Sequence, residues 1–202
     1  MNKHTYKSGV IGNCAYIAHV EDNTNINWMC WPRFDDSFIF GSLLDDEKGG
    51  SFSLLPPSES FESKQYYVEN TNILCTEISY SEGTYRVTDF APRFYQYERY
   101  YKPLMLVRKI ERISGNPQVR ATCKPMAAYG EKPLQRIQGS NHLKFFGLED
   151  ELRLSTNISF SYLLEYAPFV LNETKYLVLT YGAPLEAPLE STAETFLSKT
   201  IS

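Results

Sequence analysis

The feature that most constrains this chain is the spacing of its turn residues. Clusters of Gly, Pro, Asn, Asp and Ser recur at intervals of roughly ten residues, with short apolar stretches between them, which is typical of many antiparallel strands. In segment 73–80, Leu74, Thr76 and Ile78 alternate with Cys75 and Glu77. This period of two places the two sets on opposite faces of a strand.

Three hairpins are expected from their connecting turns. Asn and Asp tolerate left-handed backbone angles, and Gly and Pro favour tight turns. The expected pairs are 14–20 with 26–31, 73–80 with 85–90, and 104–113 with 118–125. Further strands are expected at 51–55, 60–68, 141–147, 152–156, 160–167 and 176–181.

Helix signals occur in two places only. Segment 36–44 has Asp36 or Ser37 as a possible N-cap and apolar residues three to four apart. Segment 190–201 also has apolar residues at helical spacing. So many strands with so little helix predict an all-β fold of two packed antiparallel sheets with one or two short helices.

Composition and charge exclude several classes. The 202 residues fit one large β domain, and a net charge of −4 gives no basic field for a nucleic acid. The start has no apolar core that would indicate a secretory signal, and no apolar run approaches the length of a membrane helix. We expect a cytoplasmic protein whose cysteines, with no metal-type spacing, are all free thiols: Cys14, Cys30, Cys75 and Cys123.

No catalytic motif, dinucleotide fingerprint or phosphate loop is present, so no catalytic residue, metal or cofactor is assigned. The histidines are far apart and are interpreted as surface or core-edge residues: His4, His19 and His142. Three acidic clusters are candidates for sugar chemistry, since glycosidases use paired carboxylates. Those at 45–47 and 149–151 adjoin turn residues and are interpreted as solvated loops, and the third is Asp35 with Asp36.

The most unusual segment is 27–36, which contains both tryptophans of the chain. Trp28 is expected in the core. The loop that follows combines aromatic, cationic and acidic side chains, a mixture enriched where surfaces bind partners or sugars. The candidate residues for a substrate rim or a docking surface are Trp31, Arg33, Phe34 and Asp35. We expect an exposed apolar patch that contains some of Trp31, Phe34, Phe38 and Phe40. Two alternatives stay open: Trp31 only covers the sheet edge, and Arg33 pairs internally with Asp35 or Asp89.

A family resemblance enters at the same segment. The matching residues are Ile11-Gly12-Asn13-Cys14, Ile26-Asn27-Trp28, Trp31-Pro32-Arg33-Phe34-Asp35, Phe40, Leu43-Leu44-Asp45 and Gly49-Gly50, followed by 87–92, 106–108 and the tail from Leu189 to Phe196. In this pattern the chain resembles the amino-terminal part of glycoside hydrolase family fifteen, the glucoamylase, glucodextranase and trehalase-like proteins. It departs from the family at Asn27, where relatives usually have Asp.

The resemblance implies a large β super-sandwich over 1–188, with 189–202 as the start of a linker helix toward an (α/α)₆ barrel that carries both catalytic glutamates. The barrel of the same parent chain would be the partner, and an α-glucoside such as trehalose or a malto-oligosaccharide the sugar. The chain itself would be a non-catalytic accessory domain.

Two other interpretations remain. One is an independent carbohydrate-binding sandwich that binds sugar on an exposed aromatic platform. The weaker one is a stand-alone enzyme that uses Asp35 and Asp89, although no second orienting group accompanies either residue in the sequence.

Overall fold

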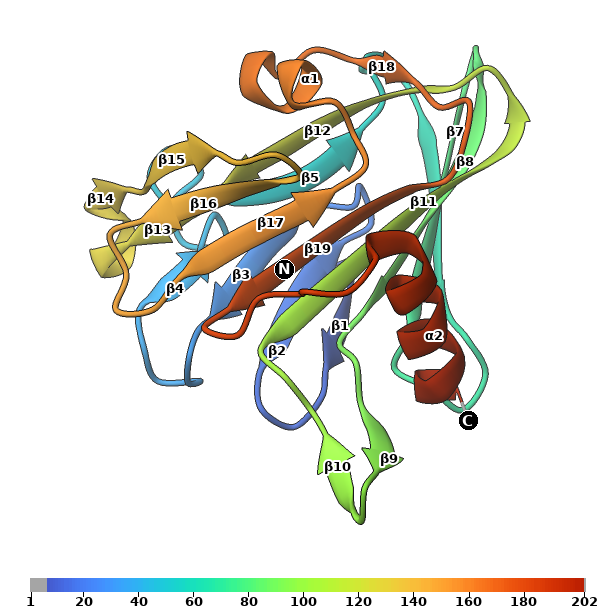
Figure 1. Cartoon of the computed structure of the whole chain (residues 1–202). Helices are drawn as coiled ribbons and strands as arrows, with labels where there is room; N and C mark the ends of the chain where they lie inside the picture. The colour runs from blue at the N-terminus through green and yellow to red at the C-terminus, as the bar shows by residue number, and fades with distance from the viewer. Residues whose placement is uncertain (1–6, 202) are drawn as a thin grey trace, which may run out of the picture.

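The structure is a computed structural model that describes residues 7–201 (Figure 1). The strands, in chain order, are β1 Ser8–Gly12, β2 Ile17–Glu21, β3 Ile26–Cys30, β4 Phe38–Phe40, β5 Ser51–Leu55, β6 Glu62–Tyr67, β7 Leu74–Tyr80, β8 Gly83–Phe90, β9 Phe94–Gln96, β10 Arg99–Tyr101, β11 Met105–Gly115, β12 Gln118–Lys124, β13 Met126–Ala127, β14 Lys132–Pro133, β15 Gln135–Gln138, β16 His142–Phe146, β17 Leu152–Thr156, β18 Phe169–Val170 and β19 Lys175–Tyr181. The helices are α1 Phe160–Glu165 and α2 Leu189–Ile201, and a 3₁₀ turn spans Ala128–Gly130.

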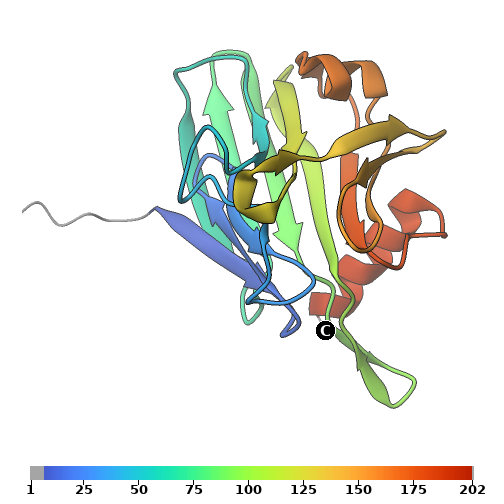
Figure 2. The same ribbon diagram turned by 90° about the vertical axis from the view of Figure 1, so that its left-hand side faces the viewer.

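Two antiparallel sheets make up the body of the molecule. One has the order β1-β2-β3-β5-β12-β18, with β4 also paired to β3. The other has the order β15-β16-β17-β19-β11-β8-β7-β6. They lie face to face, as Figures 1 and 2 show, and α2 covers the outer face of the second sheet. The all-β sandwich predicted from the sequence is confirmed.

The main core lies between the sheets. Leu54 of β5 and Val119 of β12 meet Ile78 of β7 and Leu106 of β11 in one buried cluster. Tyr85 of β8 joins the sheets by a hydrogen bond, since its hydroxyl donates to the carbonyl of Leu54 at 2.8 Å. Apolar burial of this kind is the main stabilising contribution in such a fold.

A smaller core lies under α2. The inward side chains of β11 and β19 alternate with outward ones, and the outward set is apolar as well. Val107, Val178 and Phe90 are buried there against Ala193 of α2, while Phe196 packs at the edge. The helix expected at 190–201 is therefore confirmed, and it is docked on the sheet.

Two of the expected hairpins are confirmed and one is wrong. β2 pairs with β3, and β7 with β8. Segments 104–113 and 118–125 are strands, but they do not pair: β11 lies between β8 and β19, whereas β12 pairs with β5 and β18 of the other sheet. The turn at 116–117 carries the chain from one sheet to the other.

The sequence also misplaced one helix and one strand. The expected helix at 36–44 contains β4, whose three residues are buried, followed by turns. Segment 160–167, expected as a strand, begins with α1. Both are short apolar runs, in which periodicity does not separate a strand from a helix. The four cysteines are free, and Cys75 and Cys123 lie in β7 and β12 as predicted.

Candidate functional site

The loop between β3 and β4 holds the candidate residues identified from the sequence. β3 ends at Cys30, and the Trp31–Pro32 peptide bond that follows is cis. Arg33 then donates from Nε and from its second terminal nitrogen to the two Asp35 carboxylate oxygens, both at 3.0 Å. The Arg33 amide donates to the Asp36 carboxylate, also at 3.0 Å. The loop is therefore a closed turn held by its own side chains.

The two tryptophans have the opposite roles from those expected. Trp31 is 2% exposed and packs edge-on against Tyr16, with ring centroids 5.0 Å apart. Its indole nitrogen is buried and has no hydrogen-bond partner among residues 7–201. Trp28, expected in the core, is only half-buried and packs on Phe38. Trp31 also packs against Tyr181 of β19, with ring centroids 6.3 Å apart.

The expected apolar patch is correspondingly small. Of the four rings expected to contribute to an exposed patch, Trp31, Phe38 and Phe40 are buried. Phe34 is 53% exposed and stands beside the Arg33–Asp35 pair. The pairing of Arg33 with Asp35 is the internal alternative that the sequence had left open. What the loop offers to a partner is one ring and one exposed ion pair.

Acidic side chains flank this loop. Burial raises the pKa of the Cys30 thiol, and the nearby Asp36 carboxylate raises it further. Burial also raises the pKa of Tyr181 at the end of β19, with contributions from the carboxylates of Asp150, Glu149 and Asp36. The negative field favours neutral hydroxyl-bearing or cationic partners over anions.

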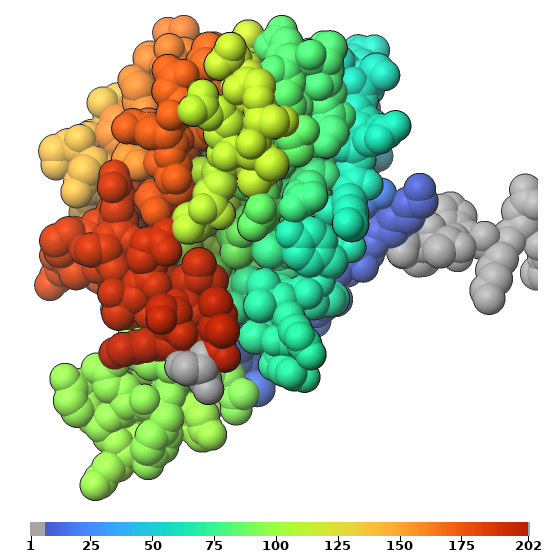
Figure 3. Space-filling model, turned by 90° about the vertical axis from the view of Figure 1, so that its right-hand side faces the viewer, coloured from blue at the N-terminus to red at the C-terminus, as the bar shows by residue number. Residues whose placement is uncertain are grey.

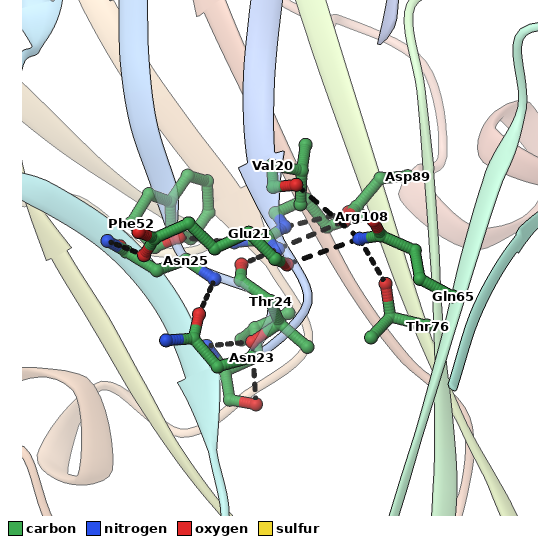
Figure 4. Close-up of polar contacts among 11 residues, drawn as sticks. Val20, Glu21, Asn23, Thr24, Asn25, Phe52, Gln65, Thr76, Asp89 and Arg108 are labelled. Atoms are coloured by element: carbon green, nitrogen blue, oxygen red, sulfur yellow. Dashed lines mark hydrogen bonds and ion pairs between the residues drawn. The ribbon is translucent and has the colours of Figure 1, made fainter. Parts of the chain in front are cut away.

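A buried ion pair holds the two sheets together. Arg108 of β11 and Asp89 of β8 are both fully buried, and Arg108 Nε lies 2.7 Å from the Asp89 carboxylate (Figure 4). Arg108 also donates to the carbonyls of Phe52, at 2.6 Å, and Thr24, both belonging to the other sheet or its turn. Its guanidinium stacks over the Phe52 ring at 4.7 Å. These contacts satisfy a charge that would otherwise be very costly to bury.

The turn between β2 and β3, whose Thr24 carbonyl accepts from Arg108, is held in place by its own hydrogen bonds. Thr24 has a φ of 78°, and its buried hydroxyl donates to the Leu54 carbonyl and accepts from the Leu54 amide, both at 3.0 Å. Gln65 and Thr76 continue the polar contacts toward β2 (Figure 4). The network joins elements far apart in the sequence, and it is structural.

Asp89 is therefore not placed for catalysis. Burial raises the pKa of its carboxyl, and the Arg108 guanidinium offsets part of that effect. A carboxylate in a bidentate pair, with no exposed surface, reaches no substrate. Asp35, the other residue of the stand-alone enzyme interpretation, lies on the exposed loop in its own ion pair.

The other acidic clusters lie in exposed loops, as expected. The backbone N–H groups of Lys48 and Glu47 lower the pKa of the Asp45 carboxyl, which closes a turn. The hydrogen bond from Lys144 is the main cause that lowers the pKa of Glu151, and Arg153 adds to it. Among residues 7–201 no group of His, Cys, Asp and Glu side chains has a metal-binding arrangement.

One histidine has partners that the sequence did not predict. The His19 ring lies 2.6 Å from the Ser8 hydroxyl and 2.7 Å from the Asn27 side-chain oxygen. Ser8 belongs to β1, His19 to β2 and Asn27 to β3. The two contacts therefore connect three neighbouring strands. His142 hydrogen-bonds to Asn141, and His4 lies outside the described residues.

Sequence reasoning also missed the β9–β10 ribbon. It forms a separate two-stranded sheet that projects below α2 (Figures 1 and 3). The missed signal was the density of aromatic residues in segment 94–101, which contains Phe94, Tyr95, Tyr97, Tyr100 and Tyr101.

Comparison with known proteins decides the family. The family model described as "Trehalase-like, N-terminal" matches residues 4–162, most of the sandwich. The chain belongs to the trehalase-like N-terminal domain family. The resemblance noted from the Trp31–Asp35 segment is thereby confirmed.

Curated relatives of this trehalase-like domain are archaeal trehalases. A trehalase of Thermoplasma volcanium is 34% identical over 146 residues, 71% of this chain and 23% of the relative. A trehalase of Thermoplasma acidophilum is 35% identical over 143 residues, 67% of this chain and 24% of the relative. Trehalase 1 of Sulfolobus acidocaldarius is 40% identical over 84 residues, 42% of this chain and 14% of the relative. The chain thus spans a quarter or less of these relatives.

No solved structure gives a significant match to the chain. Within residues 7–201, neither α-helix has the length and apolar character needed to cross a membrane.

Proposed function

We propose that this chain is the non-catalytic amino-terminal accessory domain of a trehalase-like glycoside hydrolase of family fifteen. In this proposal residues 1–188 form the accessory domain and 189–202 begin a linker to a catalytic (α/α)₆ barrel in the cytoplasm. The substrate would be an α-glucoside, with trehalose first and malto-oligosaccharides second. The observation that carries the proposal is the family match over residues 4–162, together with trehalases as relatives that extend far beyond it.

The scaffold role is supported by the way α2 is held. Lys109 of β11 lies 2.6 Å from the Glu194 carboxylate, and the Tyr176 hydroxyl donates to the same carboxylate at 2.6 Å. Apolar side chains of α2 are buried beside this cluster. A helix fixed in this way gives whatever follows it a defined direction, as a scaffold requires.

The Trp31–Asp35 loop is proposed as a rim of the sugar site or a contact with the barrel. Trp31 would support the turn by packing in the core beneath it, without contact to the sugar. Phe34 would supply a ring, and Arg33 and Asp35 would supply hydrogen-bonding groups that suit sugar hydroxyls.

The proposal that the chain alone does not cleave glycosides is supported by the chemistry of glycoside cleavage. Inversion needs an acid and a base about 6.5–9.5 Å apart across a pocket, with the pKa of the acid raised. Asp89 is locked against Arg108, while Asp35 lies on an exposed turn. Neither placement provides an acid that faces a bound sugar.

The test is glucose release from trehalose and from maltose by the purified chain, with Asp35→Asn and Asp89→Asn as comparison variants. No glucose above the buffer rate is expected for any of the three proteins. Glucose release by the unsubstituted 202-residue chain would overturn the accessory-domain proposal.

The exposed tyrosines of the β9–β10 ribbon favour one second candidate, an independent sugar-binding module. Aromatic faces pack well against the C–H faces of sugars. Titration of trehalose into the chain, followed by tyrosine fluorescence, tests it: a saturable change that is lost in Tyr100→Ser would support the module.

A further inference from the structure

The β9–β10 ribbon has two faces with different surroundings. Phe94 and Tyr101, opposite each other in the register, both pack against Phe196 of α2 with ring centroids 5.4 and 5.5 Å away. Tyr95 and Tyr100 are also directly opposite each other, on the other face, with centroids 5.5 Å apart. They are 65% and 57% exposed. One face of the ribbon is used by the helix, and the other has no cover in the described structure.

The turn of the ribbon has unusual residues. Tyr97 and Glu98 form a two-residue connection, and their φ angles are 52° and 61°. Asn-Gly is the usual pair at such positions because left-handed angles disfavour larger side chains. Tyr97 is nevertheless held there, 83% exposed. A left-handed position that presents a large ring to solvent is a candidate contact site.

The ribbon is also basic, although the chain is acidic. Segment 93–102 contains Arg93, Arg99 and Lys102 against one carboxylate, Glu98, in a chain of net charge −4. The Arg93 guanidinium lies over the Tyr100 ring at 4.8 Å. The surface therefore suits a partner with acidic side chains around an apolar centre, the pairing that aromatic and Arg anchors form in interfaces.

The last turn of α2 lies against the ribbon. The Arg93 amide donates to the Thr200 hydroxyl at 3.3 Å, and Lys199 Nζ donates to the Gln96 side-chain oxygen at 2.9 Å. Figure 3 shows the helix end and the ribbon adjoining on one side of the molecule. A polypeptide that continues beyond α2 would therefore begin beside the ribbon, and the trehalase relatives are about four times longer than the part they share with this chain.

We propose that the tyrosine face of the β9–β10 ribbon, formed by Tyr95, Tyr97 and Tyr100 with Arg93, docks on an acidic surface of the catalytic domain that follows α2. This inference rests on the proposed function. The two elements have complementary roles: α2 fixes where the catalytic domain begins, and the ribbon contacts the side of that domain. Interfaces between domains of one chain bury about 600–1,500 Å², an area that three tyrosines and an arginine can anchor without the whole sandwich face.

The first experiment compares hydrogen exchange in the 202-residue chain alone and in the polypeptide that joins the same residues to its catalytic domain. Backbone amides of 94–101 are expected to exchange at least about tenfold more slowly when the catalytic domain is present. Protection of a different surface, with 94–101 unchanged, would overturn the ribbon inference and leave the accessory function standing. Protection nowhere would overturn both.

Two variants sharpen the test. Tyr95→Ser/Tyr97→Ser/Tyr100→Ser should remove the protection of 94–101 in the joined polypeptide while the isolated chain keeps its Tm. The matched control Ile137→Ser/Phe146→Ser removes exposed apolar side chains from β15 and β16 at another edge and should leave the protection unchanged. Equal loss of protection in both variants would contradict the assignment.

Tyr97→Gly separates strain from contact. Glycine relieves the left-handed angle, so the isolated chain should be at least as stable as before. The joined polypeptide should lose protection at 94–101, because the ring is gone. A fall in the Tm of the isolated chain would show that Tyr97 serves the sandwich and would refute the docking role. Sedimentation of the isolated chain completes the set: a dimer abolished by the triple serine variant would assign the face to a second copy and would also refute it.

Discussion

Removing Arg108 should be among the most damaging single changes to this fold. Arg108→Met leaves the Asp89 carboxylate buried and unpaired, and it leaves the carbonyls of Phe52 and Thr24 without their donor. Breaking a buried pair in this way costs about 3–5 kcal/mol. For a chain of this size each kcal/mol lowers the Tm by about 2–4 °C, so the expected fall is about 6–20 °C.

The assay is urea unfolding followed by tryptophan fluorescence and circular dichroism, run as a double-mutant cycle. Arg108→Met and Asp89→Leu should each destabilise strongly, and the double variant should cost less than their sum by about 1–3 kcal/mol, since the two charges are then removed together. The double variant should remain less stable than the parent because both carbonyls are still unpaired. The matched control is the exposed pair: Arg33→Met and Asp35→Leu should each cost less than about 1 kcal/mol.

The pH dependence of Arg108→Met has a definite sign. Burial raises the pKa of Asp89 and Arg108 opposes it, so the variant leaves burial unopposed. The folded state then binds a proton more tightly than the unfolded state, and stability rises as pH falls through the folded pKa toward the unfolded pKa. The loss of unfolding free energy in Arg108→Met, relative to the unsubstituted chain, should therefore be smaller at about pH 5 than at about pH 8. A deficit that is small at both pH values, or additive costs in the cycle, would refute the structural role assigned to the pair.

Three further predictions concern the loop, the thiols and the helix. Trp31→Ala should lower the unfolding free energy by about 3–5 kcal/mol in urea, because it empties a core position. Phe34→Ser should change the unfolding free energy by no more than about 0.5 kcal/mol. Equal costs would contradict the placement of the two rings. Thiol titration should find four groups after denaturation but only Cys14 reacting rapidly in the folded chain, and fewer than four would indicate disulfides. Desolvation raises the pKa of Glu194, but hydrogen bonds led by Lys109 outweigh it and hold the pKa below its ordinary value. The stability that this contact contributes is therefore present above the unfolded pKa and is lost as pH falls through the folded pKa. Glu194→Gln should abolish that acid sensitivity in hydrogen exchange of α2, and an unchanged pH profile would argue against the contact.

The parts of the fold that the sequence predicted are the local ones. The β2–β3 and β7–β8 hairpins follow from alternating side chains around short polar turns, and α2 follows from helical spacing. The expected pairing of 104–113 with 118–125 was wrong because a short turn between strands does not say whether the chain stays in one sheet. Only contacts distant in the sequence, such as Ala121 with Leu54, settle that point.

The candidate site was predicted less well, for a related reason. Composition marked the loop after Trp28 as unusual, but burial depends on contacts distant in the sequence. Trp31 is buried against Tyr16 and Tyr181, while Trp28 stays half-buried. Asp89 and Arg108 were both part of the family resemblance, yet their contact depends on the register of β8 with β11. Neither fact can be deduced from residue types alone.

We propose above that this sandwich supports a trehalose-cleaving domain without cleaving sugar itself. The most direct measurement is glucose release from trehalose, and its half-life on warming, for the catalytic domain made with residues 1–202 attached, without them, and without them but mixed with the separate 202-residue chain. We expect full activity with the attached chain, loss of activity or a much shorter half-life without it, and at least partial recovery on mixing. A catalytic domain that is equally active and equally long-lived without residues 1–202 would contradict it.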